Sequence, residues 1–557
     1  MKLEYSKKTV MIEDSQKQVK FKDDQISFES DEYIIKTCGY FLNMDDCLSR
    51  YSCKTLVELI IKLVETGSQL PRILHGAYIV VLFRKKNNQL YIFNDLLSKH
   101  SIFYYYDEST GNLLVSDSFF DTLQMVRKKN LPFNIDTLGV KMMLWHRMFY
   151  DNLTYIREIK FLRPFEYAVV SNDKLTLETI PYPKMIDVSM EEAAGEIHKL
   201  FTKAVQEQYQ KNEKNNYPQV TTLSGGMDSR STFLYGLSNG YTNQLCYCVG
   251  ESTSADFACA QPLAIKHDCN FYFHPIDRGN GMLKRDEICK ANEGQMCYFG
   301  VSYIDIFHFY KTEQWGIIHT GLGGGEIMGD MRIAEHPSKK EKLIESLKYR
   351  LGKGKKDRSW GSFVNSLHCT DKDKKRIEAF KPYYSDFNAF QSLNDMRRCL
   401  NVQKVAGSFG VEYVSPYLNE DFFYYMLQIP YTLTKDRKLY IYWQKNYNPG
   451  QFESPSTFQL GCRPGNKVGY FAKRFYKYVM NRMGRKTGYD MIPIELWLKV
   501  NPKIKQAQDA WFEEDMKKLK HTLDPSLTQL LTNVWNNGTA PQQNLLTATW
   551  ALSRIYD

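Results

Sequence analysis

The chain carries Leu223-Ser224-Gly225-Gly226-Met227-Asp228-Ser229 between an apolar run that predicts a strand and a segment with the spacing of a helix. A Ser-Gly-Gly turn in this position folds the backbone tightly and presents several N–H groups to one anion, and the helix N-terminus adds its dipole. The hydroxyls of Ser224 and Ser229 can donate to the same anion. Asp228 fits an anion site when a divalent cation bridges its carboxylate to phosphate, so the stretch implies Mg²⁺. No Lys follows the glycines, which excludes a Walker A loop.

A plainer alternative is that the Gly-Gly turn and the following Asp-Ser merely cap a helix, as they can in any α/β protein. The surrounding pattern favours a ligand site. Apolar runs at 244–250, 271–276 and 316–321 alternate with helical spacing at 190–210 and 256–268. Such alternation predicts a parallel sheet with crossover helices. The remainder, from about residue 335, has mostly helical spacing.

Residues 1 to about 185 predict a different architecture. Short apolar or alternating runs are separated by turn signals at 85–89 and 107–112, which is typical of a β-rich block. One segment, 53–67, has apolar residues at helical spacing and ends in Gly. We therefore expect an α+β layered domain over 1–185 and an α/β domain over 186–557.

Four stretches after residue 185 match one family in order and spacing. The stretches are 224–229, 254–258, 319–326, and 408–412 followed by 415–419. They resemble the SGGxDS pyrophosphate loop, the acidic-x-x-Ala helix start, the GxGxDE turn and the S-x-x-fGxE…PfLD stretch of the asparagine synthetase family. Before residue 185, the stretches 38–43, 75–78, 94–104 and 115–117 resemble parts of the glutaminase half of the same family.

The resemblance implies an N-terminal glutaminase-like (Ntn-type) β-sandwich domain and a doubly wound PP-loop ATP pyrophosphatase domain with a helical C-terminal part. It implies an ATP-dependent carbon–nitrogen ligase that adenylates a carboxylate, releases pyrophosphate and lets an amine displace AMP. The implied ligands are ATP and Mg²⁺. The implied nucleotide-binding residues are Leu223, Ser224, Gly225, Gly226, Asp228, Ser229, Val249, Gly250, Thr320 and Gly321. By the same resemblance Asp228 and Glu326 would hold the metal, and Lys438 and Glu326 would serve catalysis.

The chain departs from the family in the glutaminase half. It begins with Met1, not with the Cys whose thiol and free amine attack glutamine, and Cys38, Tyr40 and Lys54 replace residues of the glutamine pocket. We therefore expect no glutaminase activity. The amine would come from free ammonia, from a separate amidotransferase or from the substrate itself. The last case is found in the related β-lactam synthetases and lasso peptide cyclases.

The second domain departs as well. Leu322 and Gly325 stand where the GxGxDE turn has acidic residues, which leaves Glu326 or Asp330 to supply a carboxylate. A non-catalytic ATP-binding or scaffold homologue is therefore an open alternative. So is an ammonia-dependent, asparagine synthetase-like amidotransferase of polysaccharide or natural-product biosynthesis. A PP-loop enzyme acting on RNA is a third, although no RNA-binding module is visible.

Composition narrows the class of protein. Of 557 residues 43% are apolar and 24% charged, which is globular usage and excludes a disordered chain. No run could serve as a signal-peptide core or a membrane span. The twelve Cys form no CxxC pair and predict free thiols in a cytoplasmic protein.

The expected partners are a small-molecule or peptide carboxylate and an amine donor, with nucleic acid not expected and a homodimer in keeping with the family. The net charge of 73 − 63 = +10 is compatible with anionic ligands. Basic stretches at 339–358 and 467–486 predict solvated helix faces, or else contacts to a polyanionic or carrier-linked substrate. Cys246, Cys248 and His319 are expected to be core residues.

Overall fold

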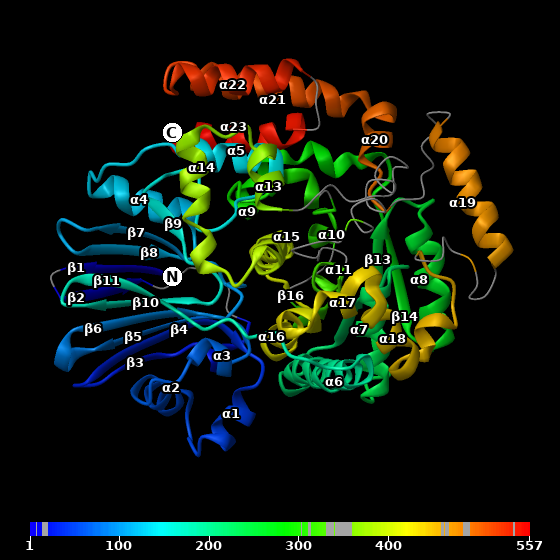
Figure 1. Cartoon of the computed structure of the whole chain (residues 1–557), viewed down its shortest axis with the longest axis horizontal. Coiled ribbons are helices and arrows are strands. Elements are labelled where there is room, and N and C mark those ends of the chain that lie inside the picture. The colour runs from blue at the N-terminus through cyan, green and yellow to red at the C-terminus, as the bar shows by residue number, and fades with distance from the viewer. Residues whose placement is uncertain are drawn as a thin grey trace.

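The computed structural model has a mixed α/β architecture, with antiparallel sheets in the N-terminal half and a parallel sheet in the C-terminal half (Figure 1). It describes residues 1–6, 8–13, 20–301, 303–309, 314–329, 339, 359–457, 462, 467–482, 491–537 and 541–556. Within these ranges, no helix combines the length and the apolar composition needed to cross a bilayer. All twelve cysteines are free thiols, as the sequence predicts.

Two antiparallel sheets stack face to face in the N-terminal half (Figure 1). The first has the strand order β2 (Thr9–Glu13), β1 (Lys2–Ser6), β8 (Asn112–Ser116), β7 (Phe103–Asp107) and β9 (Ile159–Phe161). The second has the order β11 (Lys174–Thr179), β10 (Glu166–Ser171), β6 (Gln89–Asn94), β5 (Gly76–Arg84), β4 (Tyr33–Phe41) and β3 (Ser27–Glu29).

Strand β5 explains why some runs in this half are continuously apolar. Its side chains alternate between the two faces of the sheet. Ile79 and Val81 pack against the first sheet, and Val80 and Leu82 pack against helix α2 (Leu56–Glu65) on the outside. Both faces of the strand are therefore buried.

Helices cover the outer face of each sheet of this sandwich. Helix α2 lies on the second sheet with α1 (Met44–Arg50) and α3 (Leu70–Ile73) beside it, and α4 (Phe119–Lys128) packs on β7 and β8 of the first. Thr55 caps α2 by accepting from the amide of Glu58, which fixes the start of the predicted helix. The layers run helix, sheet, sheet, helix.

The C-terminal half contains a five-stranded parallel sheet. Its order is β14 (Asn270–Pro275), β13 (Gln244–Gly250), β12 (Gln219–Thr222), β15 (Ile317–His319) and β16 (Glu412–Val414). In chain order this is 3-2-1-4-5, the order of a doubly wound sheet. The strands and the parallel pairing agree with the sequence-based expectation.

Helices lie on both faces of this sheet. Helices α7 (Met227–Ser238) and α8 (Ala255–Lys266) pack on one face with Cys246 and Cys248. Tyr247 points to the other face and hydrogen-bonds Tyr413 of β16, where α10 (Ile306–Phe309) and α15 (Phe387–Ser408) pack. A capping box at Ser189 starts α6 (Met190–Lys214), the first helix of this half.

The remaining helices follow in chain order. They are α5 (Thr137–His146) in the N-terminal half, and α9 (Arg285–Asn292), α11 (Gly324–Ile327), α13 (Trp360–Ser366), α14 (Asp371–Glu378), α16 (Glu420–Gln428), α17 (Tyr431–Thr434), α18 (Lys438–Tyr447), α19 (Lys467–Arg482), α20 (Ile494–Val500), α21 (Pro502–Leu519), α22 (Pro525–Asn536) and α23 (Pro541–Tyr556). The last helices return to the N-terminal half, where α23 packs against α5 (Figure 1).

The boundary expected at residue 185 falls between β11, which ends at Thr179, and α6, which begins at Met190. It separates the sheets, but one hydrophobic core contains residues from both sides of it, among them Met142 of α5 and Leu552 of α23. The two halves therefore share buried apolar surface.

Buried charges also join the halves. Lys99, from the loop after β6, contacts Glu420 of α16 at 2.6 Å, and both side chains are at most 7% exposed. His75 lies 2.9 Å from Glu207 of α6 and 3.4 Å from Asp421 of α16. Breaking a buried pair of this kind leaves an uncompensated charge and typically costs about 3–5 kcal/mol. The pairs therefore fix how the sandwich sits on the parallel-sheet half.

The His75 contacts predict a pH dependence of stability. Burial opposes protonation, but Glu207 and then Asp421 outweigh it, so the pKa of His75 rises to about 10 from its usual 6.5. When the pKa of a group is higher in the folded state, its contribution to stability is fully present below the pKa of the unfolded state. This contribution is lost as the pH rises through the pKa of the folded state. In urea titrations, wild type should exceed His75→Gln most in free energy of unfolding near pH 6, with the difference shrinking toward pH 10.

The control is His521→Gln, at an exposed position after α21, which should leave the pH profile of wild type unchanged. A difference between wild type and His75→Gln that stays constant from pH 6.5 to 10 would contradict the assignment of the proton to His75.

Candidate functional site

The Gly-Gly loop lies where the strand order of the parallel sheet reverses. Strand β12 pairs with β13 on one side and with β15 on the other. The loops that follow β12 and β15 therefore leave the same edge of the sheet in opposite directions. Ligands of open α/β sheets bind at this point, outside the carboxyl ends of the strands.

The loop orders itself through its own side chains. Leu223 extends the ladder by donating its amide to the carbonyl of Tyr247 at 2.8 Å. The amide of Ser224 donates to Ser229 Oγ at 3.0 Å, and the amide of Gly226 donates to Ser224 Oγ at 3.1 Å. The two hydroxyls are 2.9 Å apart. Both serines thus shape the turn as well as offering donors.

The third amide of the loop, that of Gly225, is hydrogen-bonded to a carboxylate. Gly225 N–H donates to Asp256 Oδ1, from the first turn of α8, at 3.1 Å. An anionic group at this position is what converging amides at a helix N-terminus attract. Asp256 belongs to the helix-start motif at 254–258, which by itself does not predict a site residue. Its contact with the loop depends on the tertiary structure.

Asp228 is half-buried at the first turn of α7 and accepts a hydrogen bond from Tyr440 Oη at 2.7 Å. Tyr440 Oη is also 2.9 Å from Tyr417 Oη. Burial, and then the charge of Asp228, raise the pKa of Tyr440 well above its usual value, so this hydroxyl keeps its proton. Tyr440 was missed from the sequence, although it lies two residues after the predicted Lys438.

The turn after β15 packs directly on the start of α7. A Cβ at Gly321 would lie 2.3 Å from the amide nitrogen of Ser229, and one at Gly324 would lie 2.5 Å from Cγ of Asp228. The carbonyl of Thr320 accepts from Thr232 Oγ1 at 3.0 Å. The structure therefore brings Thr320 and Gly321 close to the start of α7, and glycine is required at 321 for this approach. Their predicted role beside adenine and ribose stays a prediction.

Glu326 lies on α11 and is 8% exposed. Its carboxylate forms an ion pair with Arg398 of α15. The pair engages Oε1 and offsets the charge of Glu326, and the predicted roles as metal ligand and acid–base group stay predictions. The other candidate carboxylate, Asp330, lies outside the described residues.

Lys438 begins α18 and has an exposed side chain. The two residues before it, Asp436 and Arg437, have φ values of 55° and 60°. Successive left-handed residues other than glycine are strained by roughly 1–2 kcal/mol each. Tyr440 anchors the first turn of this helix at Asp228, and the predicted role of Lys438 stays a prediction.

Val249 and Gly250 end β13, as predicted, but they are covered. Val249 is 9% exposed, and the amide of Glu251 donates to the carbonyl of Met491 at 3.0 Å. A Cβ at Gly250 would lie 3.1 Å from Cγ of Met491. The segment that begins at Met491 therefore lies over the strand end predicted to frame adenine and ribose.

A buried arginine holds the segment that hydrogen-bonds to the loop. Arg230 of α7 is fully buried and donates to the carbonyls of Pro455, Gln451 and Ser454. Burial lowers the pKa of Arg230 to about 10, so it remains charged at neutral pH. It holds the segment 451–457, whose Thr457 amide donates to the carbonyl of Gly225 at 2.9 Å. No sequence motif indicated this support.

Three expected core residues are confirmed as such. Cys246 and Cys248 are buried between β13 and its covering helices. His319 is fully buried, stacks on Tyr209 with ring centroids 3.5 Å apart and lies 2.8 Å from Gln219 Oε1 through Nε2. Burial lowers the pKa of His319 well below its usual value, which makes it a neutral structural residue.

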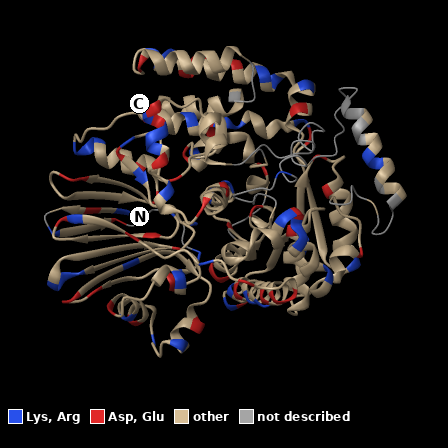
Figure 2. Ribbon diagram, in the orientation of Figure 1, with Lys and Arg blue, Asp and Glu red and all other residues tan. Residues whose placement is uncertain are grey.

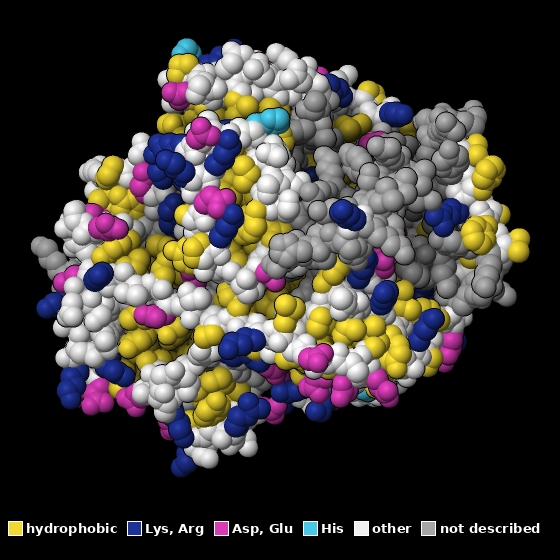
Figure 3. All heavy atoms as spheres, viewed as in Figure 1, with side chains coloured by type: hydrophobic (Ala, Val, Ile, Leu, Met, Phe, Trp, Pro, Cys, Tyr) yellow, Lys and Arg dark blue, Asp and Glu magenta, His cyan; other side chains and the backbone are white. Residues whose placement is uncertain are grey.

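The basic stretches are only partly described. Of 339–358, all residues except Lys339 lie outside the described part, as do 483–486 of the second stretch. The rest of the second stretch forms α19 at the edge of the molecule (Figure 3), where Val468, Phe471 and Phe475 are more than 60% exposed. The described side chains at 471–476 are exposed, in keeping with the solvated face expected, and this face is aromatic as well as basic. Elsewhere charges of both signs are interspersed over the described chain (Figure 2).

Comparisons with known proteins identify no family. No family model matches the chain, and no curated protein matches it. Among solved structures, an allosteric regulatory enzyme of purine biosynthesis aligns at 7% identity with a TM-score of 0.20, covering 45% of this chain and 62% of its own. The chain thus spans less than two thirds of that structure.

A second solved structure is the glutamine phosphoribosylpyrophosphate amidotransferase from B. subtilis complexed with ADP and GMP. It aligns at 10% identity with a TM-score of 0.19, covering 66% of this chain and 76% of its own. At these TM-scores neither likeness carries an argument about fold or function.

The contact between the two turns predicts a cost for Gly321→Ala. The new methyl group would meet the backbone of Asp228 and Ser229, which cannot rotate aside. We expect a loss of about 1–3 kcal/mol in free energy of unfolding, measured in urea. The control is Gly407→Ala in α15, where nothing lies within 4 Å of an added Cβ. It should be neutral or stabilising, because alanine favours a helix. Equal stability of both variants would contradict the close approach.

Proposed function

We propose that this protein is an ATP-dependent, AMP-forming carbon–nitrogen ligase or cyclase, which adenylates a carboxylate for attack by an amine. The observation that carries the proposal is the meeting of two glycine-rich turns at the reversal point of a parallel sheet, with Asp228 between them. The motif resemblance supports the same reading. The protein would thus form amide bonds.

The loop suits a pyrophosphate group in its donors. Gly225 N–H already holds a carboxylate oxygen, so a phosphate oxygen that displaces Asp256 would find the same donor and the same helix dipole. Ser224 Oγ and Ser229 Oγ lie beside it and can turn their protons outward. These groups would bind the triphosphate and stabilise the negative charge that develops on departing pyrophosphate.

Asp228 is the residue that would hold Mg²⁺, which would neutralise phosphate charge and orient the leaving group. Tyr440 orients the Asp228 carboxylate by donating to Oδ1 at 2.7 Å. Glu326, whose Oε1 pairs with Arg398, would supply the second carboxylate. Lys438 would place a cation beside the departing pyrophosphate, and Val249, Gly250, Thr320 and Gly321 would frame the nucleoside.

The amine in this proposal comes from outside the N-terminal half. Cys38 and Tyr40 stand where the resemblance places the Asn and Glu of a glutamine pocket. A pocket between the halves, lined by Tyr40, Lys99 and Ser415 among others, encloses about 10 Å³. That is room for about one water molecule. The substrate would be a small-molecule or peptide carboxylate, with ammonia or its own amine as nucleophile.

A non-catalytic nucleotide-binding homologue is the second candidate. It is favoured by one observation, which is that the three loop amides and Glu326 all have partners within the chain. Such a protein would bind ATP without releasing AMP. The two candidates differ in turnover and agree in binding.

Asp228→Asn tests the proposal. We expect Mg²⁺-dependent ATP affinity, measured by calorimetry, to fall at least about tenfold because the metal loses a charged ligand. With a panel of amino acids, small peptides and cell extract, AMP and pyrophosphate should form with wild type. Asp228→Asn should slow their formation by about a hundredfold or more.

The matched control is Asp509→Asn on α21, a half-exposed carboxylate paired with Lys505, which should behave as wild type. ADP as the product would contradict an acyl-adenylate. ATP binding without AMP for every substrate offered would favour the non-catalytic homologue.

Lys438→Ala tests the predicted cation. Because it acts on charge that develops as pyrophosphate leaves, its loss should lower the rate of ATP–pyrophosphate exchange by about tenfold to a hundredfold while ATP affinity changes little. Lys445→Ala, an exposed lysine near the other end of α18, is the control and should have no effect. Equal rates for both variants would remove Lys438 from the mechanism.

A further inference from the structure

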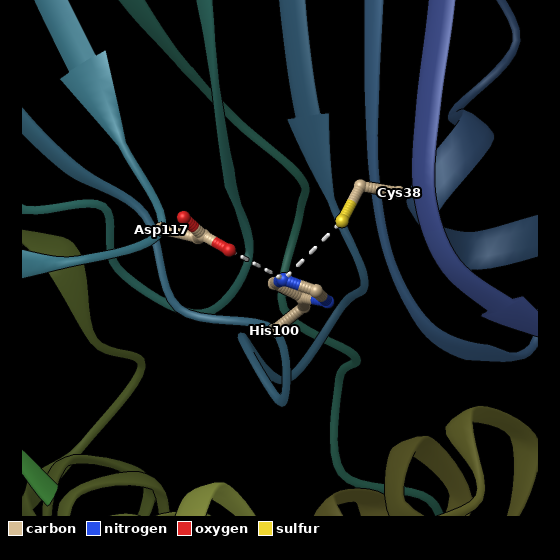
Figure 4. A group of neighbouring side chains, drawn as sticks. All are labelled: Cys38, His100 and Asp117. Carbon is tan, nitrogen blue, oxygen red and sulfur yellow. Dashed lines mark hydrogen bonds and ion pairs between the residues drawn. The ribbon is translucent and has the colours of Figure 1, made fainter. Parts of the chain in front are cut away.

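Three side chains with metal-binding chemistry converge in the N-terminal half, away from the nucleotide loop (Figure 4). Cys38 projects from β4, His100 from the loop between β6 and β7, and Asp117 from the turn after β8. One ligand atom of each lies within 4.8 Å of the other two. Within the described part of the chain, this is the one group of three or more His, Cys, Asp or Glu side chains that is so placed.

The distances between the three side chains resemble those between ligands of one metal ion. The same atom, His100 Nε2, faces Cys38 Sγ at 3.8 Å and Asp117 Oδ2 at 3.5 Å. Both contacts are long for hydrogen bonds, and a single N–H shared between two acceptors bonds each of them weakly. Zinc–ligand bonds of about 2.0–2.3 Å at tetrahedral angles place neighbouring ligand atoms roughly 3.4–3.6 Å apart. The spacings of Nε2 from Sγ and from Oδ2 match these within a few tenths of an ångström, and Sγ and Oδ2 lie within 4.8 Å of each other.

A catalytic Cys-His-Asp triad would need a different arrangement. In a triad the imidazole uses one nitrogen toward the nucleophile and the other toward the carboxylate. Here Nε2 alone faces both groups, and Nδ1 faces neither. The other alternative is a thiolate–imidazolium pair with Asp117 as the second counter-charge, 3.5 Å from His100 Nε2, and the alkylation measurement below distinguishes it from a metal site.

The ligands are held by rigid surroundings. The buried carboxylate of Asp95 accepts hydrogen bonds from the backbone amides of Lys99 and His100, each at 2.9 Å. These bonds fix the loop that carries the imidazole. Asp117 is held through its other oxygen, Oδ1, by the amine of Met1 at 2.9 Å. Oδ2 is thereby directed toward His100. Such second contacts orient first ligands in metal sites.

We propose that Cys38, His100 and Asp117 form a binding site for a borderline-soft divalent cation of the zinc type. The donor set of thiolate, imidazole and carboxylate is one that Zn²⁺ prefers. The charges of thiolate and carboxylate balance those of the ion. His100 and Cys38 are partly exposed, so an ion can enter and a fourth position is open to water or another ligand. The site is independent of the proposed nucleotide chemistry.

Cobalt titration of the full chain tests the site. Co²⁺ replaces Zn²⁺ in such sites, and a coordinated thiolate gives a charge-transfer band. We expect wild type to bind one Co²⁺ with this band and to lose the band when Zn²⁺ is added. Cys38→Ser should lack the band and bind Zn²⁺ at least about tenfold more weakly in a chelator competition. The matched control is Cys53→Ser, a half-buried cysteine outside the cluster, which should behave as wild type.

A second measurement needs no variant to fold. Zn²⁺ should slow alkylation of Cys38 by iodoacetamide at least about tenfold, as followed by peptide mass spectrometry, with no change at Cys53, and a chelator should restore the rate. Absence of the thiolate band from wild type, or an equal band in Cys38→Ser, would overturn the proposal. So would rapid alkylation of Cys38 that Zn²⁺ leaves unchanged, which is the result expected of a thiolate–imidazolium pair.

Discussion

The close approach of two turns, at the point where the strand order of the parallel sheet reverses, positions the candidate site. At Gly321 the turn after β15 contacts the backbone of Asp228 and Ser229 in the first turn of α7, and at Gly324 it contacts the side chain of Asp228. This approach fixes Asp228 beside both loops and directs its carboxylate to Tyr440. It also holds the loops that follow β12 and β15 next to each other. The candidate site lies between these two loops.

The second constraint is electrostatic and concerns the relation between the halves. Lys99 and His75 come from the sandwich, and their partners Glu420 and Glu207 come from the helices around the parallel sheet. If the two halves separated, each of these buried charges would lose its partner, which is energetically unfavourable. Asn419, which the motif resemblance places at an Asp position, caps α16 and also donates to Glu207 at 2.9 Å. Its role here is to hold the interface.

Much of the fold was predictable, because the informative patterns are local. The run that forms β5 is apolar on both faces and reads as a buried strand, and the alternation after residue 185 reads as a parallel sheet. The shared core was not predictable. Helix α23 packs on α5, some four hundred residues earlier, and no local pattern records that pairing. Lys438 and Glu326 were placed by resemblance, and the structure leaves one exposed and the other paired.

By itself the sequence determined the elements, the free thiols and the Gly-Gly turn, because strand periodicity, helix caps and glycine conformation depend on neighbours along the chain. Only the tertiary structure decided which groups meet at that turn. Asp256 and Tyr440 reach it from distant segments, with Asp256 filling the amide of Gly225. The same holds for Cys38, His100 and Asp117, since their convergence depends on how β4 and β8, in different sheets, are stacked. Contacts between distant segments are set by packing, and no short stretch of sequence encodes them.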